Sequence, residues 1–168
     1  MKKIITAVIS VLVLVSMLAS CGHTVPEPEI KEGKFDVSVT YEVNGEVETL
    51  DLVYVCEYDG VHWTLEGNRC RTWTGHFEGY EEGDAIEVSK TEDGDKIQLC
   101  FLIYAEYFMG EPDYVEYFYP DVLVERVYFE DGVEMIDSNQ ELLAEEYGAR
   151  VISVEYDEPI ENSFGTFN

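Results

Sequence analysis

Apolar and polar residues alternate at the start of the folded part of the chain. From Phe35 to Val43 every second residue is apolar, and the residues between them are polar. A period of two is typical of a strand with one buried face. Asn44-Gly45 follows and favours a two-residue type I′ turn, because both positions of that turn need a positive φ. The turn fixes a hairpin register that pairs Val39 with Leu50, Val37 with Leu52 and Phe35 with Tyr54.

Short strands separated by turn residues are predicted along most of the remaining chain. The second strand of the first hairpin is predicted over residues 46–55, with the next turn at Asp59-Gly60, and Asp131-Gly132 predicts a later hairpin. The other predicted strands cover residues 61–65, 69–77, 85–90, 96–105, 114–119, 122–130, 133–136 and 150–156.

One short helix is predicted near the C-terminus. The sequence 138–141 has the form of a capping box, with Ser138 as the N-cap and Glu141 at the third helical position. Gly148 suits the position after a helix, so the helix is predicted over residues 139–147. The expected fold is mainly β, an antiparallel β-sandwich or a curled, partly open barrel with this one short helix.

The first twenty residues follow a different pattern. Lys2 and Lys3 precede an apolar run from Ile4 to Ala19, whose 16 residues are fewer than the roughly 20 that a membrane-spanning helix needs. Leu18-Ala19-Ser20-Cys21 resembles the lipobox of bacterial lipoprotein signals. The resemblance implies cleavage before Cys21, lipid on its sulfur, and tethering to the extracytoplasmic face of the cell membrane. Two acyl chains at that sulfur would give a stable anchor, where one gives only marginal binding.

The composition divides the chain into four parts. Residues 1–20 are interpreted as the signal peptide, and residues 21–34 as the lipidated cysteine with a Pro/Glu-rich linker. An extended linker of this length would reach roughly 40 Å. Residues 35–160 are predicted to form a single β-rich domain, and residues 161–168 a C-terminal tail.

The mature chain is strongly acidic. Without Lys2 and Lys3, 8 basic residues remain against 36 acidic ones, a net charge of −28. Such a surface repels phosphate backbones, which excludes nucleic acid as a partner. The 12 Tyr, 8 Phe and 2 Trp residues favour a folded core over disorder. The chain is too short for a two-lobed transport receptor and has no βαβ pattern.

No metal, cofactor or catalytic residue is predicted. Cys56, His62, Cys70 and His76 lack the short ligand spacing of structural zinc sites. The internal thiols, Cys100 included, are interpreted as small core residues, with one disulfide among the three as the alternative. Two further functions stay open. The many carboxylates allow a cell-wall or glycan hydrolase, and acidic turns at 91–95 and 111–113 allow a calcium-binding surface domain.

The segment 104–119 is the densest aromatic stretch, with seven aromatic residues among its sixteen. Neighbouring residues of a strand face opposite sides, so these rings cannot all enter one core. We therefore interpret the segment as a contact surface of a binding or interaction module for a protein or glycan partner. The alternative is a strand pair buried on both sides. The candidate binding residues are Tyr107, Phe108, Tyr114 and Tyr117.

Two further segments carry a resemblance. Residues 55–60, Val-Cys-Glu-Tyr-Asp-Gly, and residues 158–164, Glu-Pro-Ile-Glu-Asn-Ser-Phe, are similar to acidic β-rich lipoprotein domains of Gram-positive bacteria. The resemblance implies an extracytoplasmic β domain and implies no activity.

Overall fold

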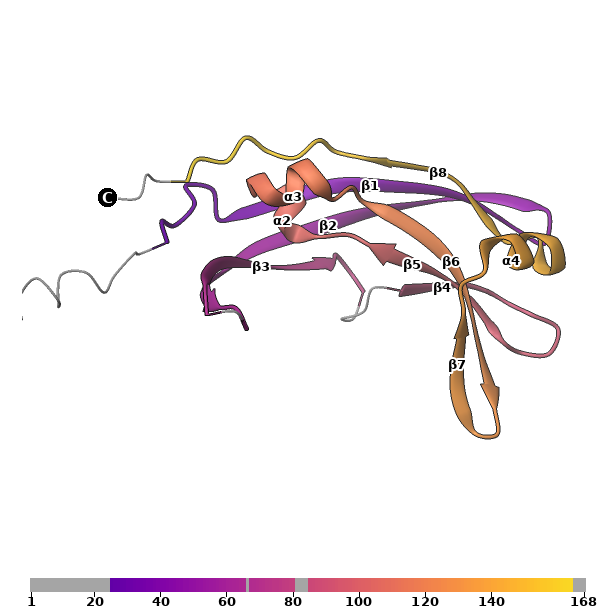
Figure 1. Cartoon of the computed structure of the whole chain (residues 1–168). Coiled ribbons are helices and arrows are strands. Elements are labelled where there is room, and N and C mark those ends of the chain that lie inside the picture. Colours follow the sequence, from indigo (N-terminus) through magenta and orange to yellow (C-terminus); the bar gives the residue numbers. More distant parts are fainter. Residues whose placement is uncertain (1–24, 66, 81–84, 165–168) are drawn as a thin grey trace, which may run out of the picture.

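Two four-stranded antiparallel sheets and a few short helices form the protein (Figure 1). The computed structural model describes residues 25–65, 67–80 and 85–164. The first sheet has the order β3 (Arg69–Phe77), β2 (Glu46–Trp63), β1 (Glu32–Val43), β8 (Arg150–Tyr156). The second has the order β4 (Ala85–Lys90), β5 (Lys96–Leu102), β6 (Asp121–Glu130), β7 (Val133–Asp137). The helices are α2 (Ala105–Phe108), α3 (Pro112–Tyr117) and α4 (Gln140–Tyr147). The predicted mainly β class is confirmed.

The first hairpin has the predicted register. Asn44 and Gly45 both have positive φ angles, of 55° and 81°, and the three predicted residue pairs lie opposite each other between β1 and β2. Asp131 and Gly132 have positive φ angles as well and join β6 to β7. In both hairpins the turn residues and the alternating pattern specify the same pairing, so local sequence was sufficient to predict it.

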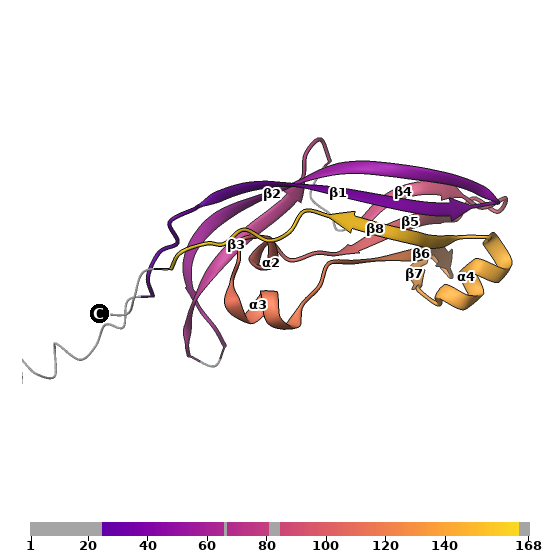
Figure 2. The same ribbon diagram turned by 90° about the horizontal axis from the view of Figure 1, so that it is seen from above.

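Alternate residues of both sheets point into one shared core. Phe77 of β3 contacts Phe101 of β5, with ring centroids 4.7 Å apart, and so joins the two sheets. Helix α2 adds Phe108, whose ring centroid lies 4.7 Å from that of Phe35 and 5.7 Å from that of Tyr54. Seen from above, α2 and α3 lie near the end of the molecule opposite α4 (Figure 2). The two helices therefore close one end of the core, and they hold the segment 104–119.

Three sequence predictions were wrong in this region of the fold. Asp59-Gly60 is not a turn, because β2 continues through it and the β2–β3 pairing shifts between Tyr58 and Gly60. This shift is a bulge, which the positive φ of Gly60 accommodates. The strand predicted over 114–119 is replaced by α3, and the one over 96–105 ends at Leu102. Pro112 explains α3, because a proline fits the first turn of a helix without loss of a hydrogen bond.

Helix α4 begins one residue later than predicted. Its N-cap is Asn139, whose side-chain oxygen accepts a hydrogen bond from the Leu142 N–H, and not Ser138. The Gln140 side chain, in the first turn of the helix, is bonded to the backbone of Val124 in β6. The left-handed Gly148 ends the helix as predicted.

Both ends of the described chain are bonded to the domain. Residues 32–34 of the predicted linker belong to β1, and Pro28 forms a β-bridge with Phe164. The Glu29 N–H donates to the Ser163 carbonyl over 3.0 Å. The segments that were expected to lie outside the domain as linker and tail therefore run along each other on its surface.

The predicted signal peptide and Cys21 lie outside the described residues. Among the helices that the structure does describe, none has the length and apolar character needed to cross a membrane.

Candidate functional site

The segment 104–119 exposes a group of rings around α3. We call this group the aromatic surface; it comprises Tyr104, Tyr114, Tyr117, Phe118 and Tyr119. The rings of Tyr114 and Phe118 are stacked, with centroids 5.0 Å apart. Tyr104 contacts both of them, at 5.9 Å and 5.2 Å. Tyr114 and Phe118 meet because residues four apart share one face of a helix.

Four of these five rings are open to solvent. The exposed fraction is 40% for Tyr104, 68% for Tyr117, 41% for Phe118 and 67% for Tyr119. Tyr114 is half-buried beneath them. Tyr104, Tyr114 and Phe118 contact one another, so the segment carries clustered exposed rings that make it a candidate contact site.

Two of the four candidate binding residues are not on this surface. Tyr107 and Phe108 are 4% and 0% exposed and pack in the core. Burial raises the pKa of Tyr107 to about 12, with a further contribution from Tyr156. For these two residues the buried alternative is correct. Sequence reasoning missed Tyr104, Phe118 and Tyr119, because it treated the segment as a strand. A helix starting at Pro112 would have placed Tyr114, Tyr117 and Phe118 on one face.

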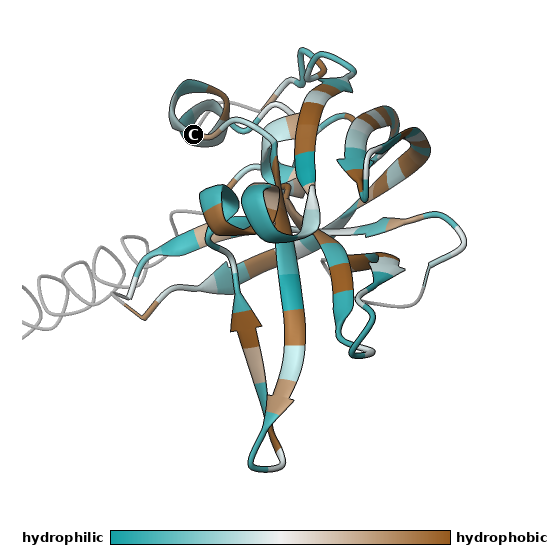
Figure 3. Ribbon diagram, turned by 90° about the vertical axis from the view of Figure 1, so that its right-hand side faces the viewer, coloured by the Kyte–Doolittle hydropathy of each residue, from teal (hydrophilic) through white to brown (hydrophobic). Residues whose placement is uncertain are grey.

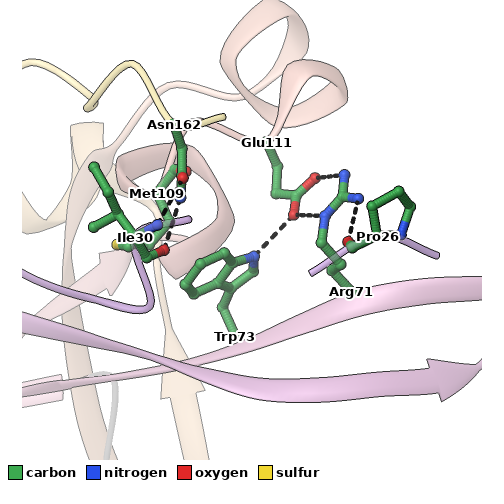
Figure 4. A network of polar contacts seen from close by, with 7 residues as sticks. All are labelled: Pro26, Ile30, Arg71, Trp73, Met109, Glu111 and Asn162. Atoms are coloured by element: carbon green, nitrogen blue, oxygen red, sulfur yellow. Dashed lines mark hydrogen bonds and ion pairs between the residues drawn. The ribbon is translucent and has the colours of Figure 1, made fainter. Parts of the chain in front are cut away.

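An ion pair that is mostly buried lies at the start of α3, the helix that carries Tyr114 and Tyr117 (Figure 4). Glu111, the residue before α3, accepts hydrogen bonds from Nε and Nη2 of Arg71 over 2.6 Å and 2.8 Å. The same carboxylate accepts a bond of 3.0 Å from the indole N–H of Trp73. Arg71 and Trp73 are two residues apart along β3 and so point to the same side of the strand. The start of α3 is thereby fixed to the first sheet.

The same arginine contacts both ends of the described part of the chain. Its Nη1 donates to the Pro26 carbonyl over 3.2 Å, and its guanidinium lies 4.0 Å from the ring centroid of Phe164. Asn162 adds a second link, because its side chain bonds the backbone of Ile30 in both directions and the Met109 carbonyl (Figure 4). The N-terminal segment, the C-terminal segment and the helices thus meet at one place. The sequence had no local signal for this, since the partners lie far apart along the chain.

Two carboxylates, the partly buried Glu106 and the buried Glu111, are relevant to the hydrolase alternative. Burial raises the pKa of Glu106, while hydrogen bonds to backbone N–H groups, including that of Trp73, act in the opposite direction. A general acid has a raised pKa and must also reach the substrate, whereas these bonds hold Glu106 against β3. Glu111 is already occupied by Arg71 and Trp73. The geometry of these two carboxylates does not support either as a catalytic acid.

The cysteine, histidine and acidic-turn candidates are separated in the structure. His62 lies opposite Cys70 in the β2–β3 ladder, but Cys56 is in the core and its pKa is raised by burial to about 12. Within residues 25–65, 67–80 and 85–164, no three His, Cys, Asp or Glu side chains gather as a metal centre. In each of the two acidic turns considered for calcium, one carboxylate is paired with an arginine, Asp95 with Arg126 and Glu111 with Arg71.

A second apolar surface lies at the other end of the molecule. The β6–β7 hairpin projects from the body and carries apolar positions along both strands (Figure 3). Phe129, Val133 and Ile136 are 66%, 59% and 57% exposed. The turn predicted this hairpin, but the sequence did not show that its apolar residues would remain uncovered. Strand β7 is also the edge of its sheet, where a partner strand can pair.

No protein-family model matches the chain, and comparisons with curated proteins and with solved structures give no significant match.

Proposed function

We propose that the protein is a binding module, held by lipid on Cys21 at the extracytoplasmic face of a bacterial cell membrane, whose aromatic surface contacts a basic protein partner. The observation that carries the proposal is the exposure of four rings on one short, firmly supported segment. Large rings on a rigid support are the usual anchors of protein interfaces. The lipobox at residues 18–21 supports the attachment.

The charges around the rings favour a basic partner. Asp113 and Glu116 of α3 are exposed beside Tyr114 and Tyr117, and the whole chain has a formal net charge of −26. Carboxylates next to aromatic faces attract lysine and arginine through ion pairs and cation–π contacts. A neutral glycan would use the rings and gain little from the carboxylates.

The test compares two surface variants in a pull-down from detergent-solubilised envelope. Tyr117→Ser/Phe118→Ser removes rings from the aromatic surface, and Val133→Ser/Ile136→Ser removes two exposed apolar residues from the β6–β7 hairpin. We expect wild type and the hairpin variant to retain the same protein, and the aromatic variant to lose it. Equal recovery by all three proteins, or by none, would contradict the proposal. Loss of a wall glycan in place of a protein would reassign the partner.

The anchor has its own test. Cells labelled with a fatty-acid analogue should incorporate it into wild type and not into Cys21→Ala, and the variant should leave the membrane fraction or keep its signal. A labelled Cys21→Ala protein would place the lipid elsewhere.

A further inference from the structure

The end of β2 and the turn that follows it carry large exposed apolar residues. Trp63 is 71% exposed, and Leu65 is fully exposed at 109%. The guanidinium of Arg69 lies 5.7 Å from the Trp63 ring centroid. We call these three residues the β2–β3 tip. Trp63 and Leu65 are too exposed to contribute to the core of the domain.

The N-terminal segment runs toward this tip. The Lys31 carbonyl accepts a hydrogen bond from the Tyr58 N–H, and the Pro26 carbonyl accepts one from Arg71. Arg71 lies opposite Val61 in the β2–β3 ladder, and the next pair on that face is Arg69 with Trp63. From residue 31 back to residue 26, the chain therefore runs along β2 toward the end of that strand. Pro26 is bonded to Arg71, and on that face only the Trp63–Arg69 pair lies beyond the Val61–Arg71 pair. The described ends of the chain and this turn lie at the same end of the molecule (Figures 1 and 2).

Little chain remains between this point and the predicted lipid. Val25 is the fourth residue after Cys21, so the two α-carbons can be at most about 14 Å apart. The linker predicted from the sequence would reach roughly 40 Å, but most of it is bonded to the domain. A lipid on Cys21 would hold this end of the domain close to the headgroups.

The tip carries one basic residue, Arg69, in a stretch that also contains Glu66. The described chain has eight Lys and Arg residues. Seven of them form ion pairs with described carboxylates, and Arg69 is the exception. On so acidic a domain, the one cation without a described carboxylate partner thus lies beside the exposed tryptophan. A cation here is drawn to anionic lipid headgroups.

We infer that the β2–β3 tip lies in the headgroup region of the membrane that carries the protein, with Trp63 and Leu65 directed toward the acyl chains. Tryptophan is favoured at this depth because its ring is apolar and its N–H is polar. The inference rests on the proposed lipid on Cys21. The domain would then sit against the bilayer in a fixed orientation, and the extended linker would not hold it away from the surface.

Tryptophan fluorescence tests the inference on the full-length lipidated protein. The chain has two tryptophans, Trp63 and the buried Trp73. The protein is reconstituted into phosphatidylcholine vesicles with a minor fraction of phosphatidylglycerol, with and without brominated acyl chains, which quench nearby indoles. We expect brominated lipid to reduce the emission of wild type and to leave Trp63→Phe, in which only Trp73 emits, unchanged.

Vesicle flotation of the same samples separates the two proposals. If wild type floats with the vesicles and brominated lipid does not reduce its emission, the tip inference is overturned and the anchor stands. If wild type does not float, the anchor fails and the tip inference fails with it. Equal quenching of wild type and Trp63→Phe would also overturn the inference, because the quenched indole would then be Trp73.

Discussion

Ser138 and Asn139 are adjacent residues of similar capping ability, and α4 uses Asn139. Asn139→Ala removes the bond to the Leu142 N–H and should lower the free energy of unfolding by about 1 kcal/mol. Ser138→Ala is the matched control and should change it by less than about 0.5 kcal/mol. Urea denaturation measures both. A larger loss in the Ser138 variant would restore the capping box that the sequence predicted.

Glu106 gives the stability of the protein a specific pH dependence. Its pKa is raised in the folded protein, chiefly by burial, so the folded state favours the protonated acid. Its contribution to stability is therefore fully present below the ordinary carboxyl pKa and is lost as the pH rises through the raised value. Glu106→Gln should be the more stable protein at about pH 7, and its advantage should shrink toward about pH 4. Denaturation at several pH values tests this, and an advantage that grows on acidification would contradict it.

The Arg71–Glu111 pair joins β3, the start of α3 and both terminal segments of the described chain. Both side chains are mostly buried, with 14% and 11% exposed, so Arg71→Met would leave the Glu111 carboxylate buried without its partner. We expect a loss of about 3 kcal/mol in the free energy of unfolding. The Glu29 N–H, which is bonded to the Ser163 carbonyl, should exchange with solvent faster in the same variant.

An exposed ion pair is the control for that experiment. Lys34 and Glu78 are 62% and 58% exposed, so Lys34→Gln should cost less than about 1 kcal/mol. Arg71→Met/Glu111→Met should recover part of the loss, because two apolar side chains leave no buried charge. A double variant less stable than Arg71→Met would show that the carboxylate matters mainly to Trp73.

At the level of elements, the sequence predicted what neighbouring residues decide. The register of the first hairpin and the bounds of β3, β4 and β8 follow from alternation and turn residues, and both are confirmed. Helix α3 was missed because its aromatic residues favour strands locally, while Pro112 and the bonds of Glu111 hold it as a helix. The Asp59-Gly60 bulge was missed because a turn and a bulge use the same residues.

For the molecule as a whole, repulsion among carboxylates should limit stability. With a formal net charge of −26, the folded state concentrates like charges, and salt screens them. Raising sodium chloride from about 0.01 M to about 0.5 M should increase Tm by about 5 °C at neutral pH. The increase should largely disappear near pH 4, where many carboxylates are neutral. A fall in Tm with salt at neutral pH would mean that ion pairs outweigh the repulsion.

The sequence could not predict how distant segments meet. Nothing local indicates that β1 pairs with β8, or that Arg71 binds a glutamate 40 positions away. For the candidate site, the sequence singled out the segment 104–119, and two of the four residues named from it, Tyr114 and Tyr117, belong to the aromatic surface. It could not separate these from Tyr107 and Phe108, because burial depends on which sheet faces lie opposite the helix.

The position of β1 between β2 and β8 sets the order in which the protein can fold. During synthesis, β1 and β2 can pair early, but the other edge of β1 stays open until residues 150–156 have been made. An open strand edge invites pairing with other chains. A nascent chain stalled before β8 should therefore aggregate more readily than the finished one. If residues 1–20 direct export as predicted, the late arrival of β8 would also keep the chain unfolded while it crosses the membrane.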